Sequence, residues 1–200
     1  MLAWDDLKAE FAWEGSWRDI CVTDTSIADW RAALGMIYAT GFSLKFTIDG
    51  AESTPPDDAL EIFGQPRETS FLLAAFVGGV QLNCHFFAET EIEFDLDPRE
   101  VIGQSELDAV ITFMRKLAGS TQKCALKTPE NTHEAAFIRV APSGIVQYIP
   151  TDGIFQELAD GRSLAVRFAA PPNKRAAAVN RRRSPAVRTR SGACCRTPLR

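Results

Sequence analysis

Acidic and basic residues are divided between two parts of this chain, and that division limits how much of it can fold. All 26 Asp and Glu residues lie at or before Asp160, whereas residues 169–200 hold nine of the 22 Lys and Arg residues and no acid. Residues 1–168 therefore carry a net charge of −13, and the basic end brings the whole chain to −4. We expect one acidic globular domain over 1–168, followed by a basic tail over 169–200.

The two parts also differ in their capacity to form a core. A domain of this size buries roughly 70% of the surface of its unfolded chain. The tail is rich in Arg, Pro and Ala and contains no aromatic residue, so it cannot build a core of its own. We predict that residues 169–200 are disordered. Translation past a shifted reading frame would also produce such an abrupt change of composition.

The cysteines and the apolar segments indicate a reduced, cytoplasmic protein. Cys21, Cys84 and Cys124 are scattered singly, which is not the pattern of a disulfide framework. The acidic N-terminus lacks the basic segment of a secretory signal. The longest apolar run, 71–80, is too short to span a bilayer, so we expect no membrane contact.

Hydrophobic periodicity predicts two main helices. A capping pair that begins at Ser26 and an apolar stripe predict a helix over 27–39. A second stripe predicts a helix over 105–117, capped by Ser105 and ended by Gly119.

Between and after these helices the pattern is that of strands joined by tight turns. Alternation or short apolar runs predict strands at 42–48, 71–77, 80–87, 91–96, 124–127, 135–140 and 145–149. Hairpins dominate this order. The sequence therefore predicts an α+β fold, with a largely antiparallel sheet and the two main helices packed on one of its faces.

The densest group of chemically active side chains lies on the predicted strand 91–96. Acids occupy alternate positions there, with apolar residues between them; the acids are Glu89, Glu91, Glu93, Asp95 and Asp97. Successive side chains of a strand point to opposite faces, so this spacing predicts a row of carboxylates on one face.

Three interpretations of this row remain open. Charge runs usually only solvate a surface. The row could also dock a basic protein partner, because a concentrated field speeds the association of oppositely charged proteins. A divalent cation is the third interpretation, although one extended strand spreads its carboxylates too far apart to surround an ion.

Two histidines complete the set of candidate residues. His85 should point away from Cys84, because adjacent residues on a strand face opposite ways. If the strands align, His85 could lie against the carboxylates, and their charge would then favour its protonated form. His133 falls in a polar turn, where a surface position is the default expectation.

The sequence shows no zinc spacing of cysteines, no phosphate-binding glycine loop and no nucleophile elbow. We therefore expect no cofactor and no metal. The favoured function is a cytoplasmic, non-enzymatic domain that binds a basic protein through its acidic strand, in the manner of an immunity or antitoxin protein. One alternative is a metal-assisted hydrolase that uses His85 and nearby carboxylates. Another, which we disfavour, is nucleic-acid binding through the tail.

Overall fold

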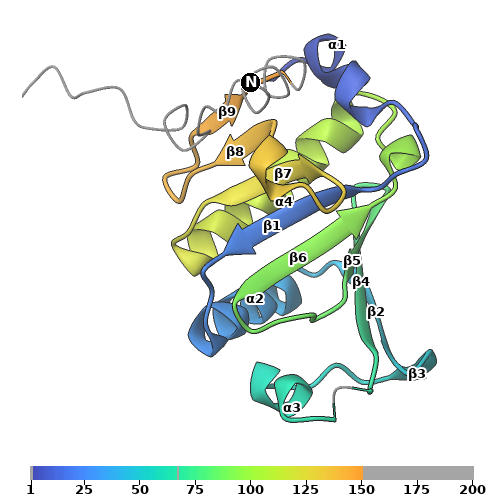
Figure 1. Cartoon of the computed structure of the whole chain (residues 1–200), viewed down its shortest axis with the longest axis vertical. Coiled ribbons are helices and arrows are strands. Elements are labelled where there is room, and N and C mark those ends of the chain that lie inside the picture. The colour runs from blue at the N-terminus through green and yellow to red at the C-terminus, as the bar shows by residue number, and fades with distance from the viewer. Residues whose placement is uncertain (1, 67, 151–200) are drawn as a thin grey trace, which may run out of the picture. The chain divides into compact units, whose positions relative to one another are not determined.

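The computed structural model describes residues 2–66 and 68–150. Within these ranges, nine antiparallel strands form one sheet, in the order β3-β2-β4-β5-β6-β1-β7-β8-β9 (Figure 1). The strands are β1 (Arg18–Thr23), β2 (Ser43–Ile48), β3 (Ala51–Ser53), β4 (Phe71–Val77), β5 (Val80–Cys84), β6 (Glu91–Leu96), β7 (Ala125–Pro129), β8 (Ile138–Val140) and β9 (Val146–Tyr148). The mixed α/β class and the antiparallel sheet are confirmed.

The described residues also form α-helices and 3-10 turns. The α-helices are α1 (Trp4–Leu7), α2 (Ile27–Ala39), α3 (Ala59–Phe63) and α4 (Gln104–Thr121), and the 3-10 turns are η1 (Lys8–Phe11), η2 (Pro98–Glu100) and η3 (His133–Ala135). None of the helices in the described ranges is long and apolar enough to cross a membrane. The predicted tail and the domain boundary at Phe168 lie outside the described residues.

Helix α2 begins and ends where its sequence predicts. The Ser26 hydroxyl accepts a hydrogen bond from the Asp29 amide, and the Asp29 carboxylate accepts one from the Ser26 amide. This capping box is local in sequence and satisfies two amide groups that the first helical turn leaves without partners.

Helix α4 differs from its prediction at both ends. Its N-cap is Gly103 rather than Ser105, and it continues past Gly119 to Thr121, where Gln122 adopts a left-handed conformation with φ 55°. The continuation buries the Thr121 side chain, whose hydroxyl donates to the Leu117 carbonyl at 2.9 Å. This packing outweighs the roughly 1 kcal/mol that a glycine costs inside a helix.

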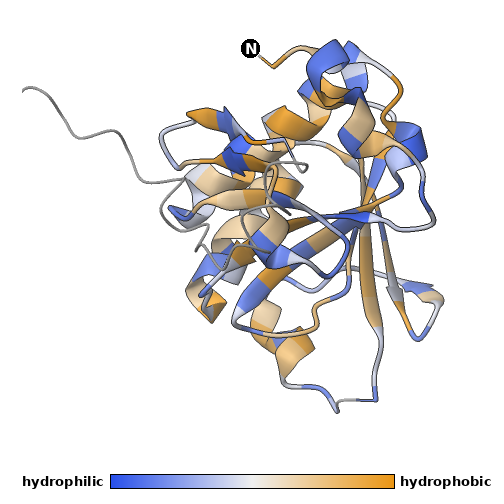
Figure 2. Ribbon diagram, turned by 45° about the horizontal axis from the view of Figure 1, so that its top comes forward, coloured by the Kyte–Doolittle hydropathy of each residue, from blue (hydrophilic) through white to orange (hydrophobic). Residues whose placement is uncertain are grey.

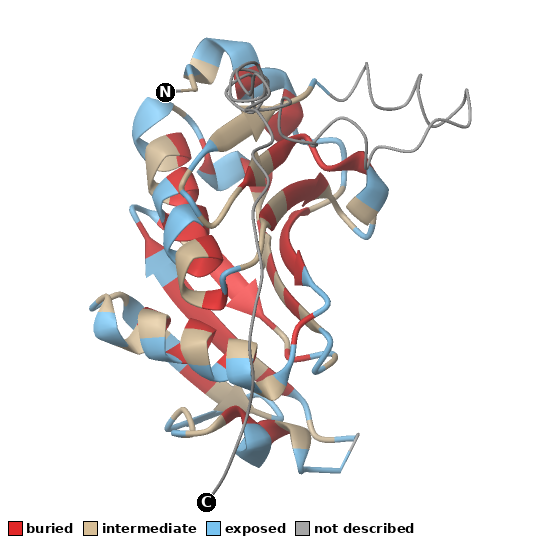
Figure 3. Ribbon diagram, turned by 90° about the vertical axis from the view of Figure 1, so that its left-hand side faces the viewer, coloured by how far each residue is buried: buried red, intermediate tan, exposed pale blue. Residues whose placement is uncertain are grey.

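The core lies between α4 and the sheet. Phe113 of α4 meets Phe94 of β6 edge to face, with ring centroids 5.0 Å apart. Hydrophobic residues alternate with hydrophilic ones along β6, whereas β4 is hydrophobic along its whole length (Figure 2). Buried residues follow the strands and the side of α4 that faces them (Figure 3).

Strand β5 ends at Cys84, three residues earlier than predicted. Phe86 has a left-handed backbone, with φ 56°, which cannot continue a strand. Its ring stacks on Trp30 at 5.1 Å and is buried. Packing of this ring therefore turns the chain away from the sheet just after His85.

Candidate metal centre on the acidic strand

Strand β6 lies in the middle of the sheet, between β5 and β1. The side chains of Ile92, Phe94 and Leu96 are buried, and Phe94 faces α4. By alternation, Glu91, Glu93 and Asp95 point to the opposite face of the sheet. The predicted separation of apolar and acidic faces on this strand is confirmed.

The five predicted acids do not form one continuous row. Glu89 precedes the strand, and its backbone carbonyl accepts hydrogen bonds from Trp30 Nε1 at 3.1 Å and Thr25 Oγ1 at 2.7 Å. Asp97 follows the strand, caps η2 and pairs with Arg99 at 2.6 Å. Only Glu91, Glu93 and Asp95 remain as a group, and each of these three is half-buried.

The neighbouring strand β1 adds two buried groups to the same face. In the β1–β6 register, Asp19 lies opposite Asp95 and Cys21 lies opposite Glu93. Cross-strand partners share a face of the sheet. Asp19 is 1% exposed and Cys21 is 0% exposed. The central acids therefore have a buried carboxyl and a buried thiol beside them.

At one end of this group, His85 contacts Asp95. Its Nε2 lies 3.0 Å from Asp95 Oδ2, while Asn83 Nδ2 donates to Asp95 Oδ1 at 2.8 Å. The imidazole also stacks on the exposed ring of Phe87, with centroids 5.2 Å apart. The hydrogen bond with Asp95 raises the pKa of His85 above 6.5. The predicted approach of His85 to the carboxylates is confirmed.

Replacing Asp95 by Asn should lower the pKa of His85 toward 6.5, measured by NMR of the imidazole over a pH series. A histidine with a raised folded-state pKa contributes stability that is fully present below pH 6.5 and is lost as pH rises through the folded-state value. Asp95→Asn should therefore flatten the pH dependence of unfolding in this window. Asp97→Asn is the matched control, because Asp97 pairs with Arg99. Equal His85 pKa values in both variants would contradict this assignment.

At the other end of the group, His133 contacts Glu91. Its Nε2 lies 3.1 Å from Glu91 Oε1, and the exposed fractions of the two side chains are 36% and 26%. Two hydrogen bonds between backbone amides and carboxylates hold the β7–β8 connection against β1 and the segment before it. The amide of Asn131 in the connection donates to Asp19 Oδ2 at 2.7 Å, and the Trp17 amide donates to Oε2 of Glu130 in the connection at 2.9 Å. His133 is thus half-buried against β6 rather than a simple surface residue.

Four side chains from three segments converge at this end. They are Cys21, Glu91, Glu93 and His133, and one ligand atom from each lies within 4.8 Å of all the others. A tetrahedral zinc site holds its ligand atoms about 3.3–3.8 Å apart, given bond lengths of about 2.0–2.3 Å. A contraction of about 1 Å would bring these atoms into that range.

One carboxylate oxygen of the group makes no hydrogen bond. Glu91 Oε1 is buried and has no hydrogen-bond partner among the described residues, although His133 Nε2 is only 3.1 Å away. The two atoms are close but are not aligned as a donor and an acceptor. Such an arrangement fits two ligands that are directed at a common third atom.

Burial and neighbouring negative charges disfavour the ionised forms of Asp19, Cys21 and Glu93 unless a cation is close by. Burial raises the pKa of Glu93, and the nearby charges of Asp19 and Glu91 raise it further. Burial likewise raises the pKa values of Asp19 and the Cys21 thiol. The fully buried Lys127 donates to the Asp19 carbonyl at 3.2 Å, but burial lowers its own pKa well below the usual value. A bound divalent cation would favour the charged form of every acid in the group.

This group could not be predicted from the sequence. The acidic strand alone spaces its carboxylates too widely to surround an ion, and no local pattern places Cys21 or His133 beside that strand. The signal that was missing is the β1–β6 register, which no local pattern reveals. Comparison with protein-family models, curated proteins and solved structures finds no match to this chain.

Proposed function

We propose that α2 and α4 pack on one face of the sheet, and that the opposite face binds a divalent transition metal ion through Cys21, Glu91, Glu93 and His133. The observation that carries this proposal is the convergence of the four ligand atoms within 4.8 Å. The buried oxygen of Glu91, which lies close to His133 but accepts no hydrogen bond from any described residue, adds support.

The donor atoms favour zinc over magnesium or calcium. A thiolate and an imidazole suit zinc and similar transition metals, whereas magnesium and calcium prefer sites made only of oxygen ligands. The proposed ligands come from β1, β6 and the β7–β8 connection. Zinc would therefore join a loop to the centre of the sheet and stabilise the folded domain.

Four protein ligands favour a binding or structural role over hydrolysis. A catalytic zinc ion usually keeps one coordination position for water, and four protein ligands complete a tetrahedral shell. His85 contacts Asp95, which is not among the four ligands. We therefore propose that this chain is a non-enzymatic metal-binding protein. No specific observation among the described residues favours the hydrolase alternative.

A second candidate function is the binding of a basic protein partner at the His85 end of the strand. Phe87 is 74% exposed there and stacks on His85, which contacts Asp95, so an aromatic anchor lies beside an acid. A small cytoplasmic protein of the immunity or antitoxin type would use such a surface. The two candidates use different ends of the strand, so variants at Phe87 and at His133 can separate them.

Zinc should raise the melting temperature of the chelator-treated protein. A ligand that binds only the folded state at a hundredfold excess over its Kd stabilises it by about 2.7 kcal/mol, which corresponds to about 5–10 °C for a domain of this size. Differential scanning calorimetry would measure the shift. Cobalt should also give the near-ultraviolet charge-transfer absorption of a thiolate ligand, because Cys21 is in the group.

Matched pairs of variants serve as controls for the melting-temperature shift and for the cobalt absorption. His133→Asn should remove most of the temperature shift, whereas His85→Asn should retain it, because each histidine contacts a carboxylate of β6 but only His133 is a proposed ligand. Cys21→Ser should abolish the cobalt absorption and Cys124→Ser should preserve it. No shift with zinc, or equal effects of the two histidine variants, would overturn the proposal.

A further inference from the structure

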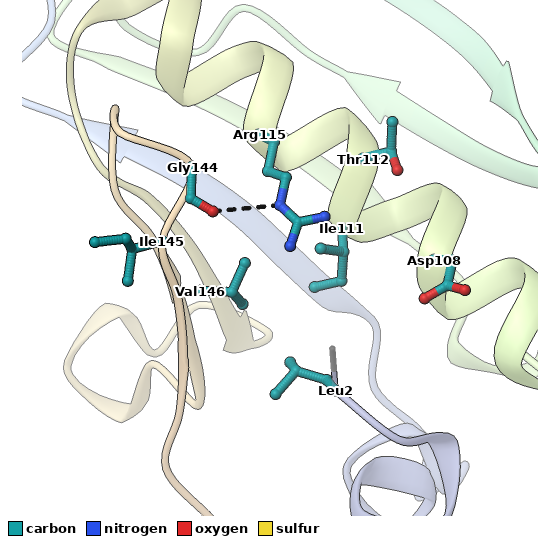
Figure 4. A pocket seen from close by; sticks show the side chains of 8 residues that line it. All are labelled: Leu2, Asp108, Ile111, Thr112, Arg115, Gly144, Ile145 and Val146. Atoms are coloured by element: carbon teal, nitrogen blue, oxygen red, sulfur yellow. Dashed lines mark hydrogen bonds between the residues drawn. The ribbon is translucent and has the colours of Figure 1, made fainter.

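A cavity of about 470 Å³ lies beside helix α4, away from the acidic strand. Its walls come from the N-terminal segment, from α4, from the β8–β9 connection and from the start of β9; the lining residues are Leu2, Asp108, Ile111, Thr112, Arg115, Gly144, Ile145 and Val146 (Figure 4). This volume is within the range of sites that bind small molecules.

Arg115 presents a guanidinium group to this cavity. Its Nε donates to the Gly144 carbonyl at 3.3 Å, and both Nη groups point toward the side chains of Ile111 and Val146 (Figure 4). No described residue accepts a hydrogen bond from these Nη groups. The contact through Nε orients the guanidinium and leaves its paired donors available to a ligand.

The remaining walls are apolar around Arg115 and acidic at the far end. Ile111, Val146 and Leu2 supply aliphatic surface, and Ile111 is 5% exposed. Asp108 lies seven residues before Arg115, about 10 Å along the helix axis. Its carboxylate accepts a hydrogen bond from Gln104 Nε2 at 2.9 Å. The cavity thus has a cationic end, an aliphatic middle and an anionic end.

We propose that this cavity binds a small amphipathic monocarboxylate. Its carboxylate would accept two hydrogen bonds from the Nη groups of Arg115, which is the geometry in which arginine binds carboxylates most strongly. Its aliphatic chain would lie along Ile111 and Val146. Asp108 would repel a second carboxylate at the far end, so the site selects monoanions over dianions. The proposal is independent of the metal site.

Hexanoate, hexanol and adipate are suitable probes for titrations of the full chain by amide NMR. Hexanoate should bind saturably and shift the amide signals of Thr112 and Gly144. Hexanol lacks the charged group, so it should bind about 10- to 100-fold more weakly, as expected for the loss of a charge-assisted hydrogen bond. Adipate keeps one carboxylate for Arg115 but brings a second one toward Asp108, so repulsion should make it bind more weakly than hexanoate.

Variants on helix α4 complete the test. Arg115→Gln should weaken hexanoate binding about 10- to 100-fold. Lys116→Gln is the control, because it removes a neighbouring charge that does not line the cavity. His133→Asn should leave hexanoate binding unchanged, which separates this site from the proposed metal centre. Equal binding of hexanoate and hexanol, or equal effects of the Arg115 and Lys116 variants, would overturn the proposal.

Discussion

Replacing Gly78 by Ala should destabilise the domain by about 2–4 kcal/mol, because two penalties act at this position. Gly78 lies in the β4–β5 turn with φ 57°, where a side chain costs about 1–2 kcal/mol. An added Cβ would also lie 2.4 Å from the Cβ of Ala109 in α4, far inside van der Waals contact. Chemical denaturation would measure the loss as a change in the free energy of unfolding.

Two further variants separate the backbone penalty from the clash. Gly79 also has a positive φ, 91°, but an added Cβ there meets no atom within 4 Å. Gly79→Ala should therefore cost only the backbone penalty, about 1–2 kcal/mol. Ala109→Gly should be destabilising in the parent protein, by about 1 kcal/mol, whereas in the Gly78→Ala background it should recover the part of the loss that comes from the clash. Equal costs at both glycines and no rescue would show that the turn does not pack on α4.

Replacing Trp30 by Ala should cost about 3–5 kcal/mol, the range for deleting a large buried aromatic side chain. Trp30 is 1% exposed, stacks on Phe86 at 5.1 Å and meets Phe63 edge to face at 5.2 Å. Its Nε1 donates to the Glu89 carbonyl at 3.1 Å. The substitution would leave a cavity beneath the segment that leads into β6, so the free energy of unfolding should fall steeply.

Trp30→Phe and Trp13→Ala are the controls for this prediction. Phe keeps an aromatic ring and loses the indole donor, while the Glu89 carbonyl still accepts from Thr25, so we expect a cost of about 1–2 kcal/mol. Trp13 is 44% exposed and contacts the guanidinium of Arg99 at 4.1 Å, so its removal should cost no more than about 1 kcal/mol. Similar losses for Trp30→Ala and Trp13→Ala would contradict the packing described above.

Elements whose signals are local in sequence were predicted well. The capping box at Ser26 and the stripe that follows it define α2, because both depend on residues at most four positions apart. The alternation in β6 predicted which face holds Glu93, and the Asp97–Pro98 pair predicted where the strand ends. Periodicity is a property of the chain itself, so it survives in any tertiary context.

Element ends that depend on packing were predicted less well. Gly119 is a reasonable end for α4, yet the helix continues and buries Thr121. The apolar run after Val80 reads as a strand to Phe87, but the ring of Phe86 packs on Trp30 and turns the chain. In both places the burial of one side chain outweighs the local preference of the backbone.

The candidate site shows the same division between local and long-range information. Alternation along β6 predicts that Glu91, Glu93 and Asp95 share a face, and the predicted pairing of strands allows His85 to approach them. Only the tertiary structure placed Cys21 and His133 beside Glu91 and Glu93, because that placement requires the β1–β6 register and the path of the β7–β8 connection. Strand register is decided by which apolar faces can be buried together across the whole sheet, and residues that lie 40 to 112 positions apart in the chain carry no local record of that choice.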